Sequence, residues 1–197
     1  MYIQMAQGKC DRQDEMRQLI DDWSTEMAGR EGWLGGTYGF TDDGRFVGVV
    51  RYESAAACER LFADEVSKKG WATAQGLCQN LEMHESGDVT MVLEGGSDSA
   101  GFVQVMTGRV ADADRMRHLI SDEMTAMLHQ ARPEILGATL AIEPDGRFME
   151  TIGFTDEATA RQGEQMEMPA DVRAELESAM AEVQYADLHH PWFASHH

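Results

Sequence analysis

The chain has 197 residues, of which 26% are charged, and its formal net charge at pH 7 is −19. The acidic residues are spread over both halves, so neither half offers a basic stripe, and we expect no nucleic acid or anionic membrane as partner. Charged or polar residues interrupt every hydrophobic stretch, and the N-terminus does not resemble a signal peptide. We therefore expect a cytoplasmic protein.

The three cysteines, Cys10, Cys58 and Cys78, lie in the first half and have no counterparts in the second. They do not form a shared disulfide framework, and we expect reduced, buried thiols. We also predict no metal site, because the adjacent histidines His189 and His190 would point to opposite faces of a strand.

The sequence contains an internal repeat. At an offset of 100 many residues of the first half recur, and after an insertion near Arg132 and Pro133 the offset becomes 102. At the second offset, Asp43-Gly44-Arg45-Phe46 aligns with Asp145-Gly146-Arg147-Phe148. The matches at the first offset include Gln4 with Gln104, Gly8 with Gly108, Met16 with Met116 and Leu19 with Leu119. The repeat predicts two modules, residues 1–94 and 102–197, joined by a Gly/Ser linker at 95–101.

Each repeat shows the same order of elements. In the first repeat, a short apolar strand over 2–9 precedes a helix whose apolar residues recur every three or four positions. Two strands over 33–41 and 45–53 follow, joined by a turn that contains Asp-Gly, which is a strong hairpin signal. Ser54 caps the next helix, and Asp156 holds the equivalent position in the second repeat. The last strand is expected near residues 81–85.

This order, strand-helix-strand-strand-helix-strand, is that of a ferredoxin-like module. It implies an α+β fold in which each antiparallel sheet has helices on one face and needs a partner for the other. A duplicated chain supplies that partner itself, so we expect two tandem ferredoxin-like (βαββαβ) modules packed sheet to sheet as an intramolecular dimeric α/β barrel. Whether two such chains pair further into a homodimer is left open.

Short motifs resemble a known superfamily. Glu31-Gly32-Trp33-Leu34-Gly35 resembles the entry to the second strand in dimeric α/β-barrel proteins of the antibiotic biosynthesis monooxygenase superfamily. Val50-Arg51-Tyr52-Glu53-Ser54, and the second repeat's Ile152-Gly153-Phe154-Thr155-Asp156, resemble its exit from the third strand. The resemblance implies a ligand between sheet and helices. Members include cofactor-independent monooxygenases acting on phenolic or quinol-like substrates, haem-degrading enzymes and proteins without a known reaction.

The resemblance implies neither haem nor another cofactor in this chain. Haem-degrading members carry an asparagine on the first strand and a histidine in the second helix. Here the single asparagine, Asn80, precedes the last strand of the first repeat, and the helix positions hold Gln75 and Gln79. Gln7, on the first strand, is a candidate to donate an amide hydrogen bond in place of the asparagine.

Small residues on the second strand, Gly35, Thr37 and Gly39, suggest where a ligand could lie. A two-residue turn would pair Gly39 with Gly48, Thr37 with Val50 and Gly35 with Tyr52, all on one face. One extra turn residue would reverse these faces. The missing side-chain volume predicts either a closely packed helix or a cavity beside the glycines.

Three further side chains of the first repeat are pocket candidates, namely Tyr52, Trp71 and His84. His84 could act as a general base toward a phenolic substrate, with Gln7 assisting proton transfer, or it could be a structural residue of the strand. The second repeat has Arg173 and Ala186 at the positions of Trp71 and His84, so we expect at most one active pocket.

Two functions follow from these observations. The first is a cofactor-independent oxygenase acting on a small aromatic or polyketide-like molecule. The second is a non-catalytic protein of the same fold that binds a small apolar or aromatic molecule or serves as a scaffold.

Overall fold

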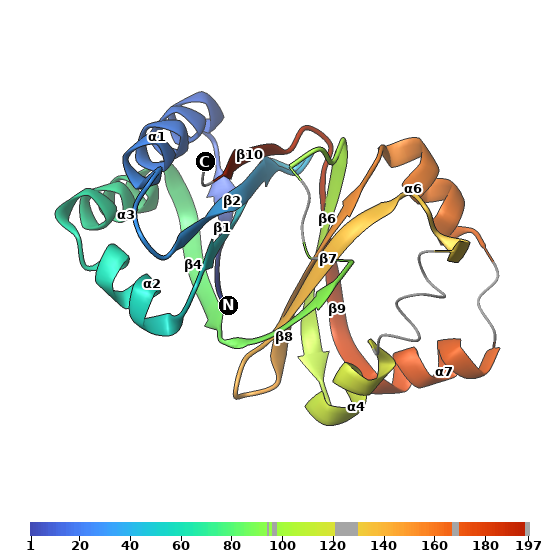
Figure 1. The fold of residues 1–197 in the computed structure, drawn as a ribbon. Helices are drawn as coiled ribbons and strands as arrows, with labels where there is room; N and C mark the ends of the chain where they lie inside the picture. The colour runs from blue at the N-terminus through green and yellow to red at the C-terminus, as the bar shows by residue number, and fades with distance from the viewer. Residues whose placement is uncertain (94, 96–97, 121–129, 167–169, 196–197) are drawn as a thin grey trace. The chain divides into compact units, whose positions relative to one another are not determined.

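The computed structural model describes residues 1–93, 95, 98–120, 130–166 and 170–195. The chain divides into two compact units, Met1–Gly87 with His190–His197, and Asp88–His189. Figure 1 shows the elements of each unit. None of the described helices is both long and apolar enough to cross a membrane.

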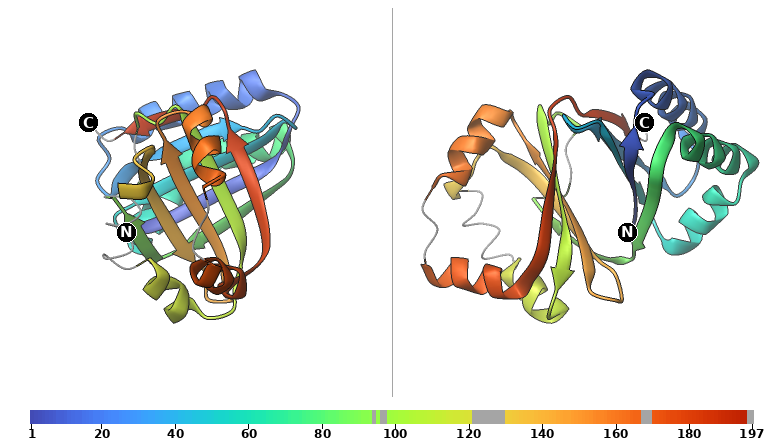
Figure 2. Two further views of the ribbon diagram at one scale, coloured as in Figure 1. Left: turned by 90° about the vertical axis from the view of Figure 1, so that its right-hand side faces the viewer. Right: turned by 180° about the vertical axis from the view of Figure 1, so that it is seen from behind.

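The first unit is a five-stranded antiparallel sheet in the order β10-β2-β3-β1-β4. Its helices α1, α2 and α3 all lie on one face of the sheet, and the view from behind shows the same grouping (Figures 1 and 2). The strands are β1 (Tyr2–Cys10), β2 (Trp33–Phe40), β3 (Arg45–Tyr52), β4 (Cys78–Ser86) and β10 (Trp192–Ser195). The helices are α1 (Gln13–Met27), α2 (Ala55–Phe62) and α3 (Glu65–Leu77).

The second unit repeats this arrangement, in the strand order β5-β7-β8-β6-β9. Its strands are β5 (Asp88–Val92), β6 (Phe102–Val110), β7 (Ile135–Ile142), β8 (Arg147–Phe154) and β9 (Met180–Leu188). Its helices are α4 (Ala113–Leu119), α6 (Glu157–Glu164) and α7 (Ala170–Ala179). The expected continuation of α4 over residues 121–129, and part of the expected linker, residues 96–97, lie outside the described residues.

The edge strand of each sheet comes from the other repeat. Trp192 to Ser195 of the second repeat pair with Tyr38 to Gly35 on β2. In the same way, β5 of the first repeat pairs with β7 of the second. The compact units therefore differ from the repeats, because the last short strand of each repeat belongs to the sheet of the other unit.

The α+β fold with ferredoxin-like element order in both units is confirmed, as are the two helix caps. The side chain of Ser54 accepts a hydrogen bond from the amide of Ala57, and Asp156 accepts one from Thr159. On α1, Met16 and Met27 of the predicted apolar stripe are fully buried. The packing of the two sheets against each other stays a prediction.

The expected pairing of β2 with β3 is wrong by one residue. Thr41 donates its amide to Arg45, and Gly44 donates back to Thr41 with a φ of 81°, so the loop has three residues, 42–44. This is the hairpin in which a glycine in the left-handed region follows a type I turn. Gly39 consequently pairs with Val47, Thr37 with Val49 and Gly35 with Arg51, and Gly48 faces the opposite side from these three small residues.

Candidate functional site

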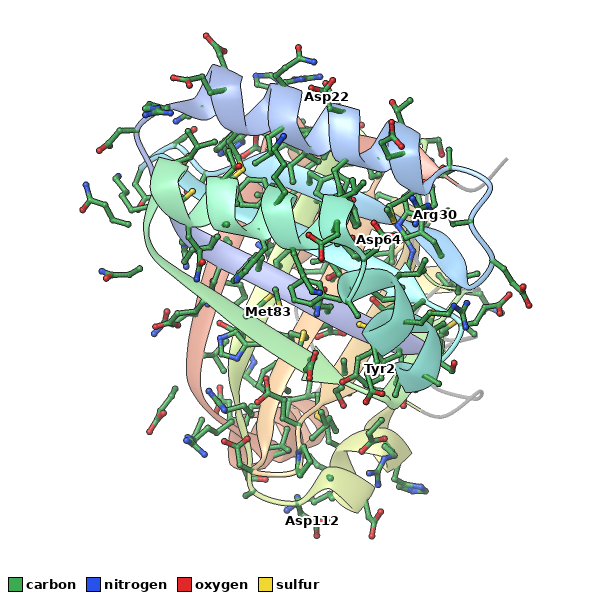
Figure 3. The ribbon with its side chains drawn as sticks, turned by 90° about the vertical axis from the view of Figure 1, so that its left-hand side faces the viewer. Tyr2, Asp22, Arg30, Asp64, Met83 and Asp112 are labelled. Carbon is green, nitrogen blue, oxygen red and sulfur yellow. The ribbon has the colours of Figure 1, made fainter. Side chains whose placement is uncertain are left out.

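A cavity of about 80 Å³ lies between the sheet and the helices of the first unit. Figure 3 views this unit from the helix side, with Met83 on β4 and Arg30 beside Asp64 at the start of α3. The residues that line the cavity come from four strands and all three helices: Gln4, Ala6, Leu19, Ile20, Trp23, Tyr38, Phe46, Gly48, Val50, Phe62, Ser67, Gly70, Trp71, Ala74, Leu81 and Met83.

Small residues line the middle of the cavity on its sheet side and on its helix side. On the sheet, Gly48 pairs with Tyr38 on one side and with Ala6 on the other. On α3, Gly70 and Ala74 face the same space. A Cβ atom at Gly70 would come no closer than 3.7 Å to Trp23, so a side chain fits there. At Gly48, by contrast, a Cβ atom would lie 2.9 Å from the ring of Phe46.

Few polar groups border the cavity, and those of Trp23 and Ser67 and the amide nitrogen of Gln4 are already paired. The indole of Trp23 donates to the hydroxyl of Ser67 at 3.1 Å. Gln4 donates its side-chain amide to the carboxylate of Glu85 at 3.3 Å. A carboxylate only accepts, so this bond fixes which end of the amide is the nitrogen. Among the described residues none donates to the Gln4 carbonyl oxygen, which therefore remains available as an acceptor.

Of the described residues that line the cavity, only Tyr38 has a titratable side chain. Burial disfavours the phenolate and raises the pKa of Tyr38 to about 12. Its ring lies over Gly36, where a Cβ atom would be 2.0 Å from the hydroxyl oxygen. The cavity therefore offers aromatic walls and the carbonyl oxygen of Gln4, and none of its described lining groups exchanges protons near neutral pH.

Two of the residues proposed from the sequence, Gly48 and Trp71, line the cavity. Gln7 and His84 do not, since they lie on the other face of the sheet, as the alternation along β1 and β4 requires. The His84 side chain is 15% exposed and lies 3.8 Å from the carboxylate of Glu82. A catalytic role for Gln7 and His84 remains a prediction, and it cannot involve this cavity directly.

The remaining candidates have close neighbours of their own. Thr37 accepts a hydrogen bond from Arg51 at 3.0 Å, and Gly39 pairs with Val47. At Gly35, which has a φ of 121°, a Cβ atom would lie 2.5 Å from the carbonyl oxygen of Ala194 on β10. Tyr52 is 1% exposed within the core, and burial raises its pKa. None of these four lines the cavity, so their proposed role in binding stays a prediction.

Sequence reasoning missed Gln4, although a signal for it was present. Gln4 recurs as Gln104, and in the second unit Gln104 also donates to a carboxylate on the neighbouring strand, that of Asp187, at 2.9 Å. A buried amide kept at the same place in both repeats indicates a polar position on an otherwise apolar sheet face.

The same place in the second unit is built from different residues. Glu150 stands where the first unit has Gly48, and a cleft of about 650 Å³, which Glu150 does not line, borders β9. Among the described residues, no three His, Cys, Asp or Glu side chains gather closely enough to hold a metal ion. The residues that line the cleft are Glu164, Met166, Arg173, Leu176, Glu177, Met180, Ala181, Glu182, Val183 and Tyr185.

The fold is shared with solved structures that are distant in sequence. A proposed monooxygenase from Lactobacillus acidophilus superposes with a TM-score of 0.76 at 11% identity, covering 98% of this chain and 95% of that one. A proposed monooxygenase from Fusobacterium nucleatum gives 0.76 at 14% identity, with 98% and 94% covered. An anthrone oxidase-like protein gives 0.67 at 12% identity, with 98% and 93% covered.

These similarities extend over both repeats, and at such low identity they establish the fold alone. The fold that the resemblance implies is therefore confirmed. No protein-family model matches the sequence, and no curated protein matches it either.

Proposed function

We propose that the cavity of the first unit binds one aromatic ring of a small phenolic or polyketide-like molecule, and that the protein is an antibiotic biosynthesis monooxygenase-like, cofactor-independent oxygenase. The observation that carries this proposal is a partly open cavity walled by Trp23, Tyr38 and Trp71, beside an acceptor without a donor among the described residues, the Gln4 carbonyl oxygen. Pockets for small organic ligands combine such apolar walls with a few polar groups.

The size of the cavity restricts the ligand. An apolar cavity of ~150 Å³ takes up benzene, so a space of about 80 Å³ accepts a single ring only if its lining adjusts slightly. Met83 and Leu19 have side chains that can change rotamer, and Trp71 is only half-buried. A tricyclic molecule would seat one ring and leave the others outside.

The free oxygen of Gln4 favours a hydroxyl on the ring. A phenol would place its ring among the aromatic walls and donate its O–H to Gln4, whose own amide is held by Glu85. Gln4 is 6% exposed, and hydrogen bonds in such surroundings are stronger than in water.

The proposed oxygenation converts a ring CH₂ group, activated by a neighbouring phenol, into a carbonyl group. One O₂ is consumed, one of its oxygen atoms enters the product, and the other leaves as water with the two hydrogens of the CH₂ group. The substrate itself is the reductant. The protein's part is to hold the hydroxyl at Gln4 and to shield the ring from solvent.

A second candidate function is binding without turnover. It is favoured because none of the described side chains that line the cavity titrates near neutral pH, since the pKa of Tyr38 is about 12. General-base catalysis at pH 7 works best with a group whose pKa is near that value.

Binding can be tested with a matched pair of substitutions on α3. Gly70 lines the cavity, whereas Gly76 is exposed, and a Cβ atom added at Gly76 would meet no described atom within 4 Å. Gly70→Leu should fill the cavity and abolish binding of phenol or 1-naphthol, followed by the fluorescence of Trp23 and Trp71. Gly76→Leu adds the same side chain to the same helix and should bind like the wild type. Equal binding by both variants would refute the site.

Turnover is tested separately, by oxygen uptake with a panel of quinols and anthrone-like phenols. We expect uptake that is lost in Gly70→Leu and kept in Gly76→Leu. If binding persists without uptake above background, the second candidate function stands and the oxygenase does not. His84→Ala tests the general-base role expected from the sequence, and an unchanged rate of uptake would remove that role.

A further inference from the structure

Cys10 and Cys78 lie directly opposite each other on neighbouring strands of the first unit. Cys10 is the last residue of β1, Cys78 is the first residue of β4, and the two are partners in the antiparallel ladder. Both belong to one buried cluster, with exposed fractions of 1% and 6%, and paired residues share a face of the sheet. The Cys10 thiol donates to the carbonyl oxygen of Leu77, the residue before Cys78, at 3.5 Å.

The backbone hydrogen bonds show that this pair is of the close kind. The amide of Cys10 donates to the carbonyl oxygen of Gly44 at 2.9 Å, on the side of β1 where β3 lies. The amide of Cys78 donates to Ala74 of α3. Neither amide is directed at the opposite cysteine, so the two residues form a non-hydrogen-bonded pair, in which Cα atoms are about 4.5 Å apart and side chains come closest. A disulfide requires Cα atoms about 4.4–6.8 Å apart, and this pair meets that requirement.

We propose that Cys10 and Cys78 are a modification site, at which a small disulfide such as oxidised glutathione forms a reversible cross-strand disulfide that holds the first unit closed. In the structure both side chains are free thiols. One cysteine thiolate attacks a sulfur of the small disulfide, whose S–S bond breaks and releases one small thiol. The second cysteine then attacks the mixed disulfide and releases the other small thiol. The two cysteines are oxidised, the small disulfide is reduced, and the two thiol protons pass to the released thiols.

The third cysteine does not compete for this bond. Cys58 lies on α2 and belongs to a different buried cluster, together with Met27, Trp33 and Tyr52. Its element is a helix that covers the sheet, whereas Cys10 and Cys78 are brought together by the pairing of β1 with β4. Oxidation should therefore select Cys10 and Cys78 and leave Cys58 as a thiol.

The reaction requires local opening at the end of β4. Burial, followed by the neighbouring Cys10 thiol, raises the pKa of Cys78, so the closed pair contains little of the reactive thiolate. β4 is an edge strand of its sheet, and its register with β1 shifts between Gln7 and Lys9, just before the cysteine pair. An edge strand with an interrupted ladder can separate at one end while the centre of the sheet stays intact. The bond then forms as the strand end closes again.

The disulfide would close a loop that contains β2, β3 and all three helices of the first unit. A bond across such a loop disfavours opened states of the chain. Ala74 and Leu81, which lie on either side of Cys78 in the sequence, line the cavity, so the bond also ties one wall of the cavity to β1. The modification site does not depend on any ligand of the cavity, and the proposed function can fail without affecting it.

The bond is tested by treating the full chain with oxidised glutathione at pH 8, blocking the remaining thiols in denaturant and mapping the peptides by mass spectrometry. Trypsin places each cysteine in a separate peptide, because it cleaves after Lys9, Arg51 and Lys69 and again before the next cysteine. We expect a Cys10–Cys78 cross-linked peptide within a single chain, a blocked Cys58, and loss of the cross-link after treatment with dithiothreitol. Cys58→Ala is the matched control and should form the same bond. The absence of this cross-link, or a cross-link to Cys58 or to a second chain, would overturn the proposal.

A second measurement tests whether the bond holds the unit closed. The rate at which a thiol reagent labels Cys58, read from its own peptide, should be at least about tenfold lower in the oxidised wild type than in the reduced wild type. Cys78→Ala treated with oxidised glutathione should label Cys58 at the rate of its untreated form, since it cannot form the bond. Both forms in the main comparison are wild type, so it does not depend on the folding of a variant. Equal rates in the two forms would overturn the proposed effect on opening.

Discussion

Positions 48 and 150 show how a single residue sets the chemistry of a sheet face. Gly48 lies between Tyr38 and Ala6 in the sheet of the first unit, and Glu150 lies between Leu140 and Met106 in that of the second. Gly48 leaves space on the sheet, and the rings of Tyr38 and Phe46 occupy part of it beside the cavity. Glu150 instead introduces a carboxyl group into an apolar layer. A buried carboxyl group without a partner destabilises the fold once it ionises.

Glu150 should therefore make stability depend on pH. Its pKa is raised from 4.5 to about 7, so its favourable contribution is complete below pH 4.5 and is lost as pH rises through 7. Relative to Glu150→Gln, the wild type should lose at most roughly 3 kcal/mol between pH 4.5 and 8, less because the side chain is partly exposed. Urea denaturation of both proteins across this range measures the difference. A constant difference would contradict the raised pKa.

At the scale of elements, β10 is the strand on which the first unit's aromatic core depends. Trp192 lies 5.8 Å from Tyr38, 5.6 Å from Phe40 and 6.4 Å from Phe46 between ring centroids. The guanidinium of Arg17 on α1 lies 4.8 Å from the centre of the same ring. One side chain from the second repeat thus supports two walls of the first unit's cavity.

Trp192→Ala should destabilise the first unit and enlarge its cavity. Loss of a large aromatic side chain from a core costs about 3–5 kcal/mol, and the partial exposure of Trp192 places the expected value at the low end. Because Tyr38 and Phe46 lose their support, the variant should bind two-ring phenols more tightly relative to phenol. Denaturant midpoints and fluorescence titrations measure the two effects. An unchanged ligand preference would show that Trp192 does not shape the cavity.

The sequence predicted the elements well and their edges poorly. Repeated apolar spacing, Asp-Gly turns and Ser54 or Asp156 caps are local signals, and each marks an element of the structure. The predicted β2–β3 register was wrong because Asp42-Asp43-Gly44 is compatible with a loop of two residues or of three. The two loops differ by one residue in register, so they bring different residues of β3 to the helix side of the sheet. The exchange of edge strands was missed because the pairing of an edge strand depends on residues that are distant in the sequence. Gly35 is small where Ala194 of β10 comes close to it, but this reason is visible only in the structure.

A cavity beside the sheet was one of the two alternatives that the sequence left open. Trp71 and Gly48 line it, whereas Gly35, Thr37 and Gly39 lie on the other face as a result of the register. Gln4 was overlooked because an amide on a strand carries no recognisable motif, and its hydrogen bond to Glu85 joins residues that are far apart in the sequence.

On the scale of the whole molecule, all three thiols report on the first unit. Cys10, Cys58 and Cys78 are at most 6% exposed, and burial raises the pKa of Cys58 to about 12. A thiol reagent reacts with the thiolate, so labelling requires the unit to open. The second unit contains no cysteine and does not contribute.

Removing residues 190–197 should accelerate thiol labelling at least tenfold at pH 8. The deletion takes away β10 and leaves β2 as an unpaired edge, which lowers the free energy of opening by more than ~1.4 kcal/mol. Absorbance of a released aromatic thiol measures the rate, and the denatured protein gives the three-thiol endpoint. The same labelling rate in both chains would mean that β10 does not contribute to the stability of the first unit.

The exchanged edge strand also determines the order in which the protein can be completed during synthesis. Residues 1–87 leave the ribosome first, yet Trp192 is translated more than a hundred residues later. Until then the nascent first unit has an open sheet edge and an incomplete aromatic core. The unit that contains the cavity is therefore begun at the start of translation and completed only at its end, and a prematurely terminated chain would lack the support that Trp192 gives to Tyr38 and Phe46.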